Sequence, residues 1–583
     1  MSSFKPVSMQ EVDIFLLEKD LDKIGSILFD LKLMEFFNLE KKGFSKYSSM
    51  DNSELSAHLL SLRSTISYLK QFKTNDSGKV IKNSFEKVTL LRKEEKEVHE
   101  KITHLQDDQK RQKVLASLKI NPKDIEQKKV IVGFIGRDDE SNIESLKKKK
   151  LIKHTFTFED RIYFSCSSPK EITFSYKEFY LPKKITVDIP LKIKTLEKKK
   201  EKIFTELKEI ANGNLLHLQR EELKLSKETA LLESKIKFNK TDNFTVISGY
   251  VPSEKIKLLE RSLEEELGDS FEMKKKIAKG DDVPTKLDNP GFSGNYEELL
   301  KMYSLPKYGE FDPTFLMFLI FPIFYGLILG DVGYGLLSLI LFTLIKPKFP
   351  QFKGFISILQ VSAIFSTLFG VFYGEYFGYE PHIFPFEYHR SEDPVPLLYA
   401  AIGFGLVHLN LGLLIGFFQE WKHSKYHAIM DKLVWIILQI GVFSWIGGAL
   451  IASSALTILG MVFFALAVIM LVKEHGFMGI IEIPSFFTNL LSYARLMAVG
   501  VSSVVIAILI NEFSIPMIQN GIISGFFGIL LLLVGHIFNM VLGNFESFLH
   551  SLRLHYVEFF TKFYTGNGRE FEPFGKRVHK KDD

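Results

Sequence analysis

The pattern of hydrophobic and polar residues divides the chain into two unlike parts. Roughly the first 300 residues are rich in Lys, Glu and Leu, whereas long runs of Phe, Leu, Ile and Gly begin at about residue 312. About 20 consecutive apolar residues suffice to cross a bilayer. We therefore predict a mainly α-helical polytopic membrane protein, with a cytoplasmic arm over 1–310, a membrane domain over 311–565 and a cytoplasmic tail over 566–583.

The apolar runs predict eight membrane-spanning helices. The first two runs are separated only by Gly330 and Asp331. Because their joint length of about 30 residues exceeds one crossing, we expect a helical hairpin that turns at this point. The eight predicted spans are 314–330, 331–346, 354–376, 396–419, 431–451, 455–472, 482–511 and 521–560.

Loop charges orient the predicted spans. With the amino terminus inside, the lysine-bearing second and fourth connections and the basic tail are cytoplasmic, and the acid-rich third connection, EPHIFPFEYHRSEDP, is outside. This arrangement follows the positive-inside rule and places both termini in the cytoplasm. The last two spans would measure about 45 and 60 Å, against a hydrocarbon core of about 30 Å. We therefore expect two long, tilted helices.

Leucine and isoleucine recur at helical spacing in two segments of the cytoplasmic part. The first seam runs from Leu55 to Leu69, and the second from Leu196 to Leu232, with Gly213 marking a break between two registers. Two separated seams predict an antiparallel coiled coil. An opening helix over 18–33, strand-like stretches (KKVIVGFIG, IKHTFTFED, RIYFSCSS and KEITFSY) and a strand–turn–helix pattern in DNFTVISGYVPSEKIKLLERSLEEEL predict a small α/β lobe at each end of the arm.

The composition limits the cellular compartment and the classes of binding partner that we expect for this chain. The net charge of +5 is small for 583 residues and is not accompanied by a nucleic-acid-binding motif, so we assign the basic excess to the membrane surface and topology. Cys166 is the only cysteine, which excludes an intrachain disulfide. The amino terminus lacks the apolar stretch of a signal peptide, and we expect the arm to stay in the cytoplasm.

Two arginines, Arg495 and Arg553, lie within the last two apolar segments. An Arg near the centre of a spanning helix costs about 2.5–3.5 kcal/mol on insertion scales and usually faces a cavity or a carboxylate. The pair therefore indicates ion or proton handling. The alternative is that both side chains extend to the membrane surface and keep their charges in water.

Other residue patterns argue against metal and nucleotide sites. His423 and His427 could share one helix face, but two ligands without a third seldom hold zinc. GDVGYG lies within apolar helices and lacks the preceding strand and the lysine of a phosphate-binding loop. We expect no cofactor, no metal, no nucleic acid and no direct nucleotide binding, so this chain alone should not be an ATPase.

Motifs along the second half resemble those of one family. DDVPTKLDNP, YSLPKYGEFDPT, FPIFYGLILGDVGYGLL, FGVFYGEYFG, HLNLGLLIGF, SYARLMAVG and HSLRLHYVEFFTKFYTGNGREFEPF occur in this order. The series is similar to the membrane stator subunit of V-type and A-type rotary ATPases, called subunit a in eukaryotes and subunit I in bacteria and archaea. SGYVPSEK extends the resemblance to the end of the arm. The length resembles the compact prokaryotic form.

The resemblance implies partners and a mechanism. A ring of proteolipid subunits, each with an ion-binding carboxylate, would rotate against this chain, while two offset half-channels load and unload the ring. Peripheral stalk subunits, a membrane-sector subunit associated with the central stalk, and lipid would be the other partners. Arg495 and Arg553 match the two stator arginines. Glu482 resembles a carboxylate of the cytoplasmic half-channel, and His550 falls on a polar position of that channel.

The outer half-channel departs from the family pattern. Ser503 stands where eukaryotic relatives often have His, and Gly543 where they often have Glu. Polar groups that could serve this path instead, or equally well cap helices and solvate loops, are Asp331, Glu375, Asn511, Glu512 and Glu546.

Two other functions compete with the stator reading. A secondary transporter would show internal repeats with broken helices in both halves, and the sequence shows no such symmetry. A purely structural anchor would leave the two arginines unexplained. The sequence leaves open whether the coupling ion is a proton or sodium and whether the complex pumps or synthesises ATP. The resemblance favours a prokaryotic plasma membrane.

Overall fold

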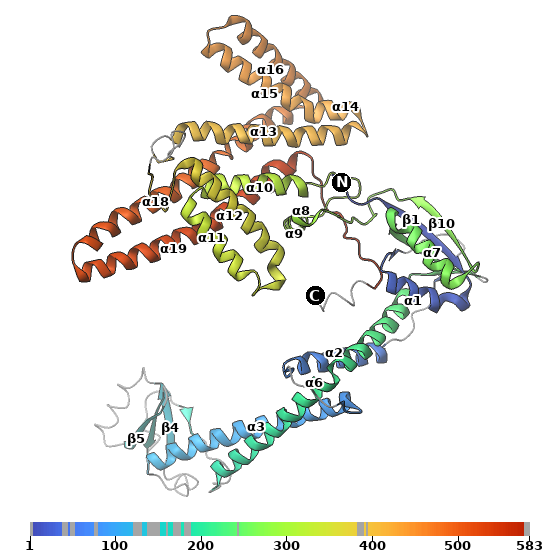
Figure 1. Ribbon diagram of the computed structural model, residues 1–583, viewed down its shortest axis with the longest axis vertical. Helices are drawn as coiled ribbons and strands as arrows, with labels where there is room; N and C mark the ends of the chain where they lie inside the picture. Colours follow the sequence, from blue (N-terminus) through green and yellow to red (C-terminus); the bar gives the residue numbers. More distant parts are fainter. Residues whose placement is uncertain are drawn as a thin grey trace. The chain divides into compact units, whose positions relative to one another are not determined.

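In the computed structural model, the chain folds into two compact units (Figure 1). The first unit combines Met1–Tyr47 with Lys237–Arg577, and the second contains Ser48–Ile236. Structural statements below concern residues 4–37, 45–46, 53–74, 80–119, 131–136, 152–158, 161–166, 177–179, 188–241, 244–381, 390–391 and 394–575.

Three helices form the arm of the second unit: α2 (Ser53–Lys70), α3 (Ser84–Ser117) and α6 (Ile189–Lys235). Both α2 and α3 pack on α6 through a buried seam of Leu, Ile and Val. The helix α6 passes without interruption through Gly213. The seam continues to Leu218, but Leu225 and Leu232 beyond it are only half-buried. The apolar seams of the arm therefore pack helix against helix, as predicted. Whether these helices form a coiled coil stays a prediction.

A small antiparallel sheet completes the second unit. Its strand order is β5-β6-β4-β7, and the end of α3 packs on it through Val114 and Leu118. Three of the predicted strands are confirmed, whereas KEITFSY lies outside the described residues. The strands are β4 (Ile131–Gly136), β5 (Ile152–Phe158), β6 (Arg161–Cys166) and β7 (Lys177–Glu178).

The second lobe belongs to the first unit and surrounds a sheet of order β10-β1-β9-β8-β3, with β2 paired to β9. Two amphipathic helices, α1 (Leu21–Leu31) and α7 (Ile256–Leu267), bury their apolar faces in its core. The predicted opening helix and the strand–turn–helix are confirmed. The strands are β1 (Met9–Leu16), β2 (Glu35–Phe36), β3 (Ser45–Lys46), β8 (Asn239–Lys240), β9 (Thr245–Pro252) and β10 (Phe271–Ile277).

Long apolar helices make up the rest of the first unit, after the short α8 (Gly291–Gly294) and α9 (Glu297–Tyr303). Within the described residues, six helical stretches are long and apolar enough to cross a membrane. Figure 1 shows α18 and α19 side by side, and α15 packs along α16. The helices are α10 (Thr314–Leu329), α11 (Val332–Ile345), α12 (Lys353–Tyr373), α13 (Pro394–Trp421), α14 (Lys425–His427), α15 (Val434–Leu450), α16 (Ser454–His475), α17 (Phe477–Leu491), α18 (Ala494–Gln519) and α19 (Ile522–Arg553).

The helix boundaries refine the predicted spans. The first two spans are separate helices, and the chain turns between them at Gly330 and Asp331 as expected. They have 16 and 14 residues, which gives about 24 and 21 Å and falls short of a hydrocarbon core of about 30 Å. The count of eight spans therefore stays a prediction. The predicted span over 482–511 lies within one candidate membrane span, Phe477–Gln519, whose helix is interrupted at Ser492 and Tyr493 between α17 and α18.

The C-terminal segment returns from the apolar helices to the lobe of the first unit. We call residues 565–575 the strap. Its backbone pairs with Thr285, which donates to Arg569 O at 2.6 Å and accepts from Phe571 N at 3.0 Å. Further along, Phe574 N donates to Met34 O at 2.8 Å. The strap therefore ties the helices to the lobe by bonds between backbones.

Candidate functional site

The two predicted arginines lie where helices are irregular. Arg495 occupies the first turn of α18, directly after the break at Ser492 and Tyr493. Arg553 is the last residue of α19, and a π-helix, Leu554–Phe559, follows it. Because π turns occur frequently at functional sites, this placement supports a role for both residues beyond filling the interior.

A carboxylate that the sequence reasoning missed, Glu558, lies beside Arg553. Arg553 Nε is 4.0 Å from Glu558 Oε1, and the side chain of Arg553 is 54% exposed while that of Glu558 is 2% exposed. In a regular α-helix, residues five apart do not face each other. The π turn closes i→i+5 bonds and brings the two side chains to the same side.

Arg495 completes a cluster with an excess of positive charge. It interacts electrostatically with Arg553 and Glu558, and its Nη1 is buried without a hydrogen-bond partner in the part of the chain that the structure describes. Two guanidiniums therefore share one carboxylate. Arg495 is half-buried and the Arg553 side chain is 54% exposed, so the cluster carries one net positive charge partly open to solvent.

His550 and Glu482 connect to this cluster in different ways. His550 is half-buried on α19 and interacts electrostatically with both arginines. Glu482 is exposed on α17 and is linked to Glu558 through Lys562, which interacts with both carboxylates. The structure thus places Arg495, Arg553 and His550 in one electrostatic cluster with Glu558. Glu482 interacts with Lys562, and its role in ion transfer stays a prediction.

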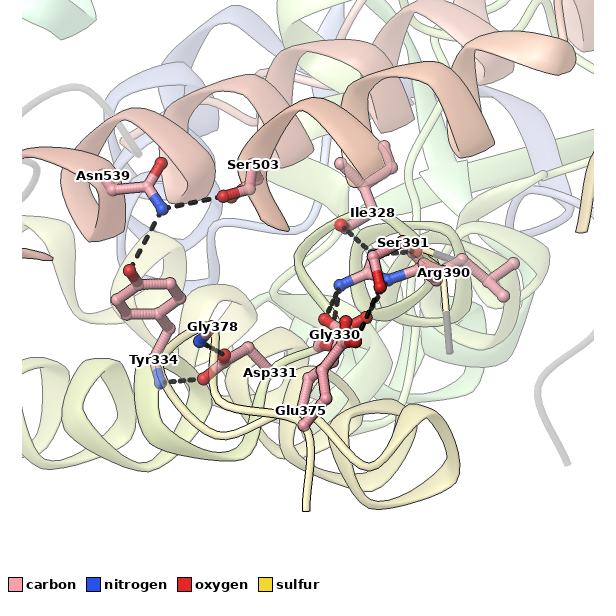
Figure 2. Close-up of polar contacts among 12 residues, drawn as sticks. Ile328, Gly330, Asp331, Tyr334, Glu375, Gly378, Arg390, Ser391, Ser503 and Asn539 are labelled. Carbon is pink, nitrogen blue, oxygen red and sulfur yellow. Dashed lines mark hydrogen bonds and ion pairs between the residues drawn. The ribbon is translucent and has the colours of Figure 1, made fainter. Parts of the chain in front are cut away.

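Glu375 and Arg390 form a second ionic site, shown in Figure 2. Arg390 Nε donates to Glu375 Oε1 at 2.8 Å, and Nη2 donates to Glu375 Oε2. Further bonds run from Nη1 to Leu327 O and Ile328 O at 3.3 and 2.8 Å, and from Nη2 to Gly330 O at 2.8 Å. The guanidinium thereby caps the last carbonyls of α10. Arg390 was missed because an arginine in a polar loop reads as solvated.

Asp331 has the contacts of a helix cap. Its Oδ1 accepts from Tyr334 N at 2.8 Å at the start of α11, and its Oδ2 accepts from Gly378 N at 3.3 Å (Figure 2). Glu375, also a predicted half-channel residue, is fully buried against Arg390. Their present contacts are structural, and a role for either carboxylate in ion transfer stays a prediction.

The remaining predicted polar residues do not join the arginine cluster. Glu512 is exposed on α18, about 25 Å along the helix from Arg495. Glu546 is half-buried on α19, about 10 Å from Arg553 along its axis. His427, considered above as a metal ligand, pairs with Glu474 at 3.2 Å. No group of three His, Cys, Asp or Glu in the described ranges is arranged to hold a metal.

Comparison with known proteins gives the family. The V-type ATPase 116 kDa subunit family matches residues 148–437 and 489–575, well over half of the chain. A-type ATP synthase subunit I of Methanocaldococcus jannaschii is 30% identical and covers 76% of this chain and 72% of its own length. The subunit I of Archaeoglobus fulgidus is 36% identical and covers 50% of this chain and 53% of its own length.

Other matches agree with this result. V-type ATP synthase subunit I of Borreliella burgdorferi is 26% identical, over 59% of this chain and 62% of its own length. For the A-type relatives from Archaeoglobus fulgidus and Pyrococcus horikoshii, the chain spans about half their length. A crystal structure of the cytoplasmic N-terminal domain of a subunit I aligns to 46% of this chain and to 100% of its own length, at 14% identity, but its TM-score of 0.22 supports no argument.

The predicted resemblance to subunit I is therefore confirmed. The relatives named subunit I come from both archaea and bacteria, and the apolar helices make this chain a multi-pass membrane protein. On the family match and the coverage of the methanogen relative, the chain belongs to the V-type ATPase 116 kDa subunit family.

Proposed function

We propose that this chain is the stator subunit of the membrane sector of a rotary V/A-type ATPase and forms two ion half-channels against a proteolipid ring. The observation that carries the proposal is the cluster of Arg495, Arg553 and Glu558, in which two cations share one carboxylate. A ring carboxylate that leaves lipid would meet this excess positive charge. An opposite charge within about 4–6 Å favours the ionised carboxylate, so the ring would release its ion here.

The arginines also separate the two half-channels. Arg effectively never loses its proton, whereas a desolvated Lys can. A guanidinium between the channels therefore blocks direct ion leakage, and ions must travel on the ring. Glu482, Lys562 and Glu558 form a row of charges that would guide ions on the cytoplasmic side.

The wider assembly completes the proposal. The chain would have eight spans, with the last two tilted against the ring, and both termini in the cytoplasm of a prokaryotic cell. The arm over 1–310 would bind peripheral stalk subunits and the membrane-sector subunit at the central stalk. The domain over 311–565 would couple ATP hydrolysis or synthesis elsewhere in the complex to transport of protons, or of sodium.

ATP-driven ion uptake by vesicles that hold the whole complex tests the proposal. Arg495→Ala should abolish uptake while the ring and the other subunits remain assembled, and Arg495→Lys should retain only part of it. Arg261→Ala is a matched control, because Arg261 is an exposed arginine on α7 that pairs with Glu265. Normal uptake by Arg495→Ala, with the complex intact, would refute the proposed role of the cluster.

A further inference from the structure

A chain of hydrogen-bonded side chains joins α11, α18 and α19 beyond the arginine cluster. Tyr334 lies at its centre, with its hydroxyl 2.7 Å from His536 Nδ1 and accepting from Asn539 Nδ2 at 3.0 Å. His536 Nε2 is 3.0 Å from Asn511 Oδ1, and Asn511 Nδ2 donates to Phe377 O at 2.8 Å. Figure 2 shows the inner part of this chain, from Tyr334 to Asn539.

The partners determine the direction of each bond. Because the Asn511 amide nitrogen donates to Phe377 O, the Asn511 oxygen accepts a hydrogen bond from His536 Nε2–H. His536 Nδ1 is then unprotonated and accepts from the Tyr334 hydroxyl, whose oxygen accepts from Asn539. All bonds therefore point the same way, from Asn539 to Phe377, which is the order that a proton relay needs.

Within this row of hydrogen-bonded side chains, His536 is the residue that ordinarily binds and releases protons between about pH 5 and 8. It is half-buried, and the rings of Tyr334 and Phe377 pack against it. The charged groups on the elements around it are Asp331, bonded to backbone amides at the start of α11, and Glu512, exposed on α18. Glu375, two residues before Phe377, is paired with Arg390, and Glu546 lies ten residues further along α19. No charged side chain among the described residues contacts the imidazole.

Both ends of the chain can accept further polar partners. At the inner end, Asn539 is 1% exposed, and its Oδ1 has no hydrogen-bond partner within the described ranges. Its Nδ2 also donates to Ser503 O at 3.0 Å, which holds the amide in place. A buried, unpaired oxygen is a typical site for an ordered water. At the other end, Asn511 lies about 24 Å along α18 from Arg495 and is half-buried.

We propose that His536 is the proton relay of the outward half-channel, an inference that rests on the stator function proposed above. A water beside Asn539 takes a proton from a ring carboxyl group and gives one to the Tyr334 oxygen, as the Tyr334 hydroxyl proton passes to His536 Nδ1. The new N–H bond makes an imidazolium, whose Nε2–H group exchanges its hydrogen bond to Asn511 Oδ1 for one to an entering water and gives its proton to that water. One proton enters and one leaves. The neutral imidazole of His536 then regains its starting tautomer by exchanging protons with water.

A relay at His536 would supply a titratable group to a half-channel that has Ser503 and Gly543 where eukaryotic relatives often have His and Glu. The sequence offers no titratable side chain at either position, whereas the structure places a histidine two helical turns before Gly543 on the same helix. The ligands of hard cations such as Ca²⁺ and Mg²⁺ are mainly oxygens, and an imidazole in the middle of the path suits protons better. The relay therefore assigns protons as the transported ion on this side.

The test is ATP-driven proton uptake by inside-out vesicles that contain the whole complex, with the internal pH set between about 5 and 8. A positioned proton donor or acceptor contributes about 10²–10⁴-fold to a rate. We expect His536→Gln to lower uptake at least tenfold and to abolish its dependence on internal pH, and Tyr334→Phe to lower uptake less. Added imidazole should restore uptake to His536→Ala. His423→Gln changes an exposed histidine that is not part of the hydrogen-bonded row, and its proton uptake should equal that of the wild type.

The outcomes separate this proposal from the stator function. Wild-type uptake and pH dependence in His536→Gln, together with loss of uptake in Arg495→Ala, would overturn the relay and leave the stator function intact. Sodium uptake that does not change in His536→Gln would also overturn the relay. If His536→Gln fails to assemble, Tyr334→Phe keeps the imidazole and removes only the hydroxyl donor. Unchanged uptake in Tyr334→Phe would then count against the proposal.

Discussion

Two ionic sites in the same set of helices, one fully buried and one partly exposed, use arginine in opposite ways. At Arg390, five N–H donors make five hydrogen bonds, to both oxygens of Glu375 and to three carbonyls. At Arg495, one nitrogen has no partner among the described residues, and a single carboxylate, Glu558, faces two guanidiniums. The first site is satisfied and structural. The second is under-neutralised, and that property suits it to bind and release an anion.

The largest expected effect comes from removing the satisfied arginine. Arg390→Met would leave Glu375, which is 0% exposed, without its counter-charge, and breaking a buried ion pair costs about 3–5 kcal/mol. Thermal unfolding of the purified protein in detergent should show this loss. Arg553→Met is the matched control, because its side chain is 54% exposed and a solvent-exposed ion pair contributes about 0–1 kcal/mol. Equal losses in the two variants would contradict the distinction.

The double variant Arg390→Met, Glu375→Leu sharpens this comparison. Replacing both members of a buried ion pair by apolar residues is often neutral or stabilising, so most of the lost stability should return. Continued instability would show that the carbonyls of α10, rather than Glu375, are the essential partners of Arg390.

A smaller loss is expected at the ring beneath Arg390. The guanidinium lies 4.4 Å from the centroid of the Tyr373 ring, and a desolvated cation–π contact contributes about 2 kcal/mol. Tyr373→Leu should therefore destabilise the protein by about 1–2 kcal/mol, measured by the same unfolding experiment. Tyr399→Leu, at an exposed tyrosine on α13, should leave stability unchanged.

Glu558→Gln should change stability less but transport more. Its partner Arg553 is largely exposed, so we expect a stability change within about 1 kcal/mol, well below that of Glu375→Gln. Uptake by the whole complex should fall at least tenfold, because the two guanidiniums would hold a ring carboxylate too tightly. A stability loss as large as that of Glu375→Gln would make Glu558 a structural partner.

The smallest effect concerns a third pair, Glu35 and Arg569, at 2.5 Å between the lobe and the strap. Burial raises the pKa of Glu35, and Arg569 opposes this shift only in part. A pKa above the unfolded value means that the stabilising contribution of Glu35 is complete below about pH 4.3 and is lost as the pH rises through the folded pKa. Between pH 4 and 7, the wild type should therefore lose stability relative to Glu35→Gln. A gain would show that the ion pair outweighs desolvation.

Hydropathy and charge predicted much of the fold because those signals are local. Long apolar runs located the helices, and Gly330 with Asp331 located the first turn between them. The break at Ser492 and Tyr493 was missed, since both residues lie in a continuous apolar stretch and contacts from other helices decide where that stretch bends. The length and tilt of each membrane span depend on the thickness of the bilayer, and a hydropathy pattern carries only an average value of that thickness.

The candidate site could be predicted only in part. A charge in an apolar segment identified Arg495 and Arg553 without any knowledge of the fold. Glu558 was missed because regular helical spacing places it on another face, and only the π turn brings it to Arg553. His536 was overlooked because a half-buried histidine has no distinctive spacing.

The strap has a mechanical consequence. Its bonds to Thr285 and Met34, and that of Glu572 N to Glu35 Oε2 at 2.7 Å, are distributed over several successive residues. A force that pulls the lobe away along the strap loads these bonds together, in shear, rather than breaking them one at a time. Such an attachment yields abruptly or not at all, so the lobe and the helices should behave under load as a stiff joint instead of stretching apart.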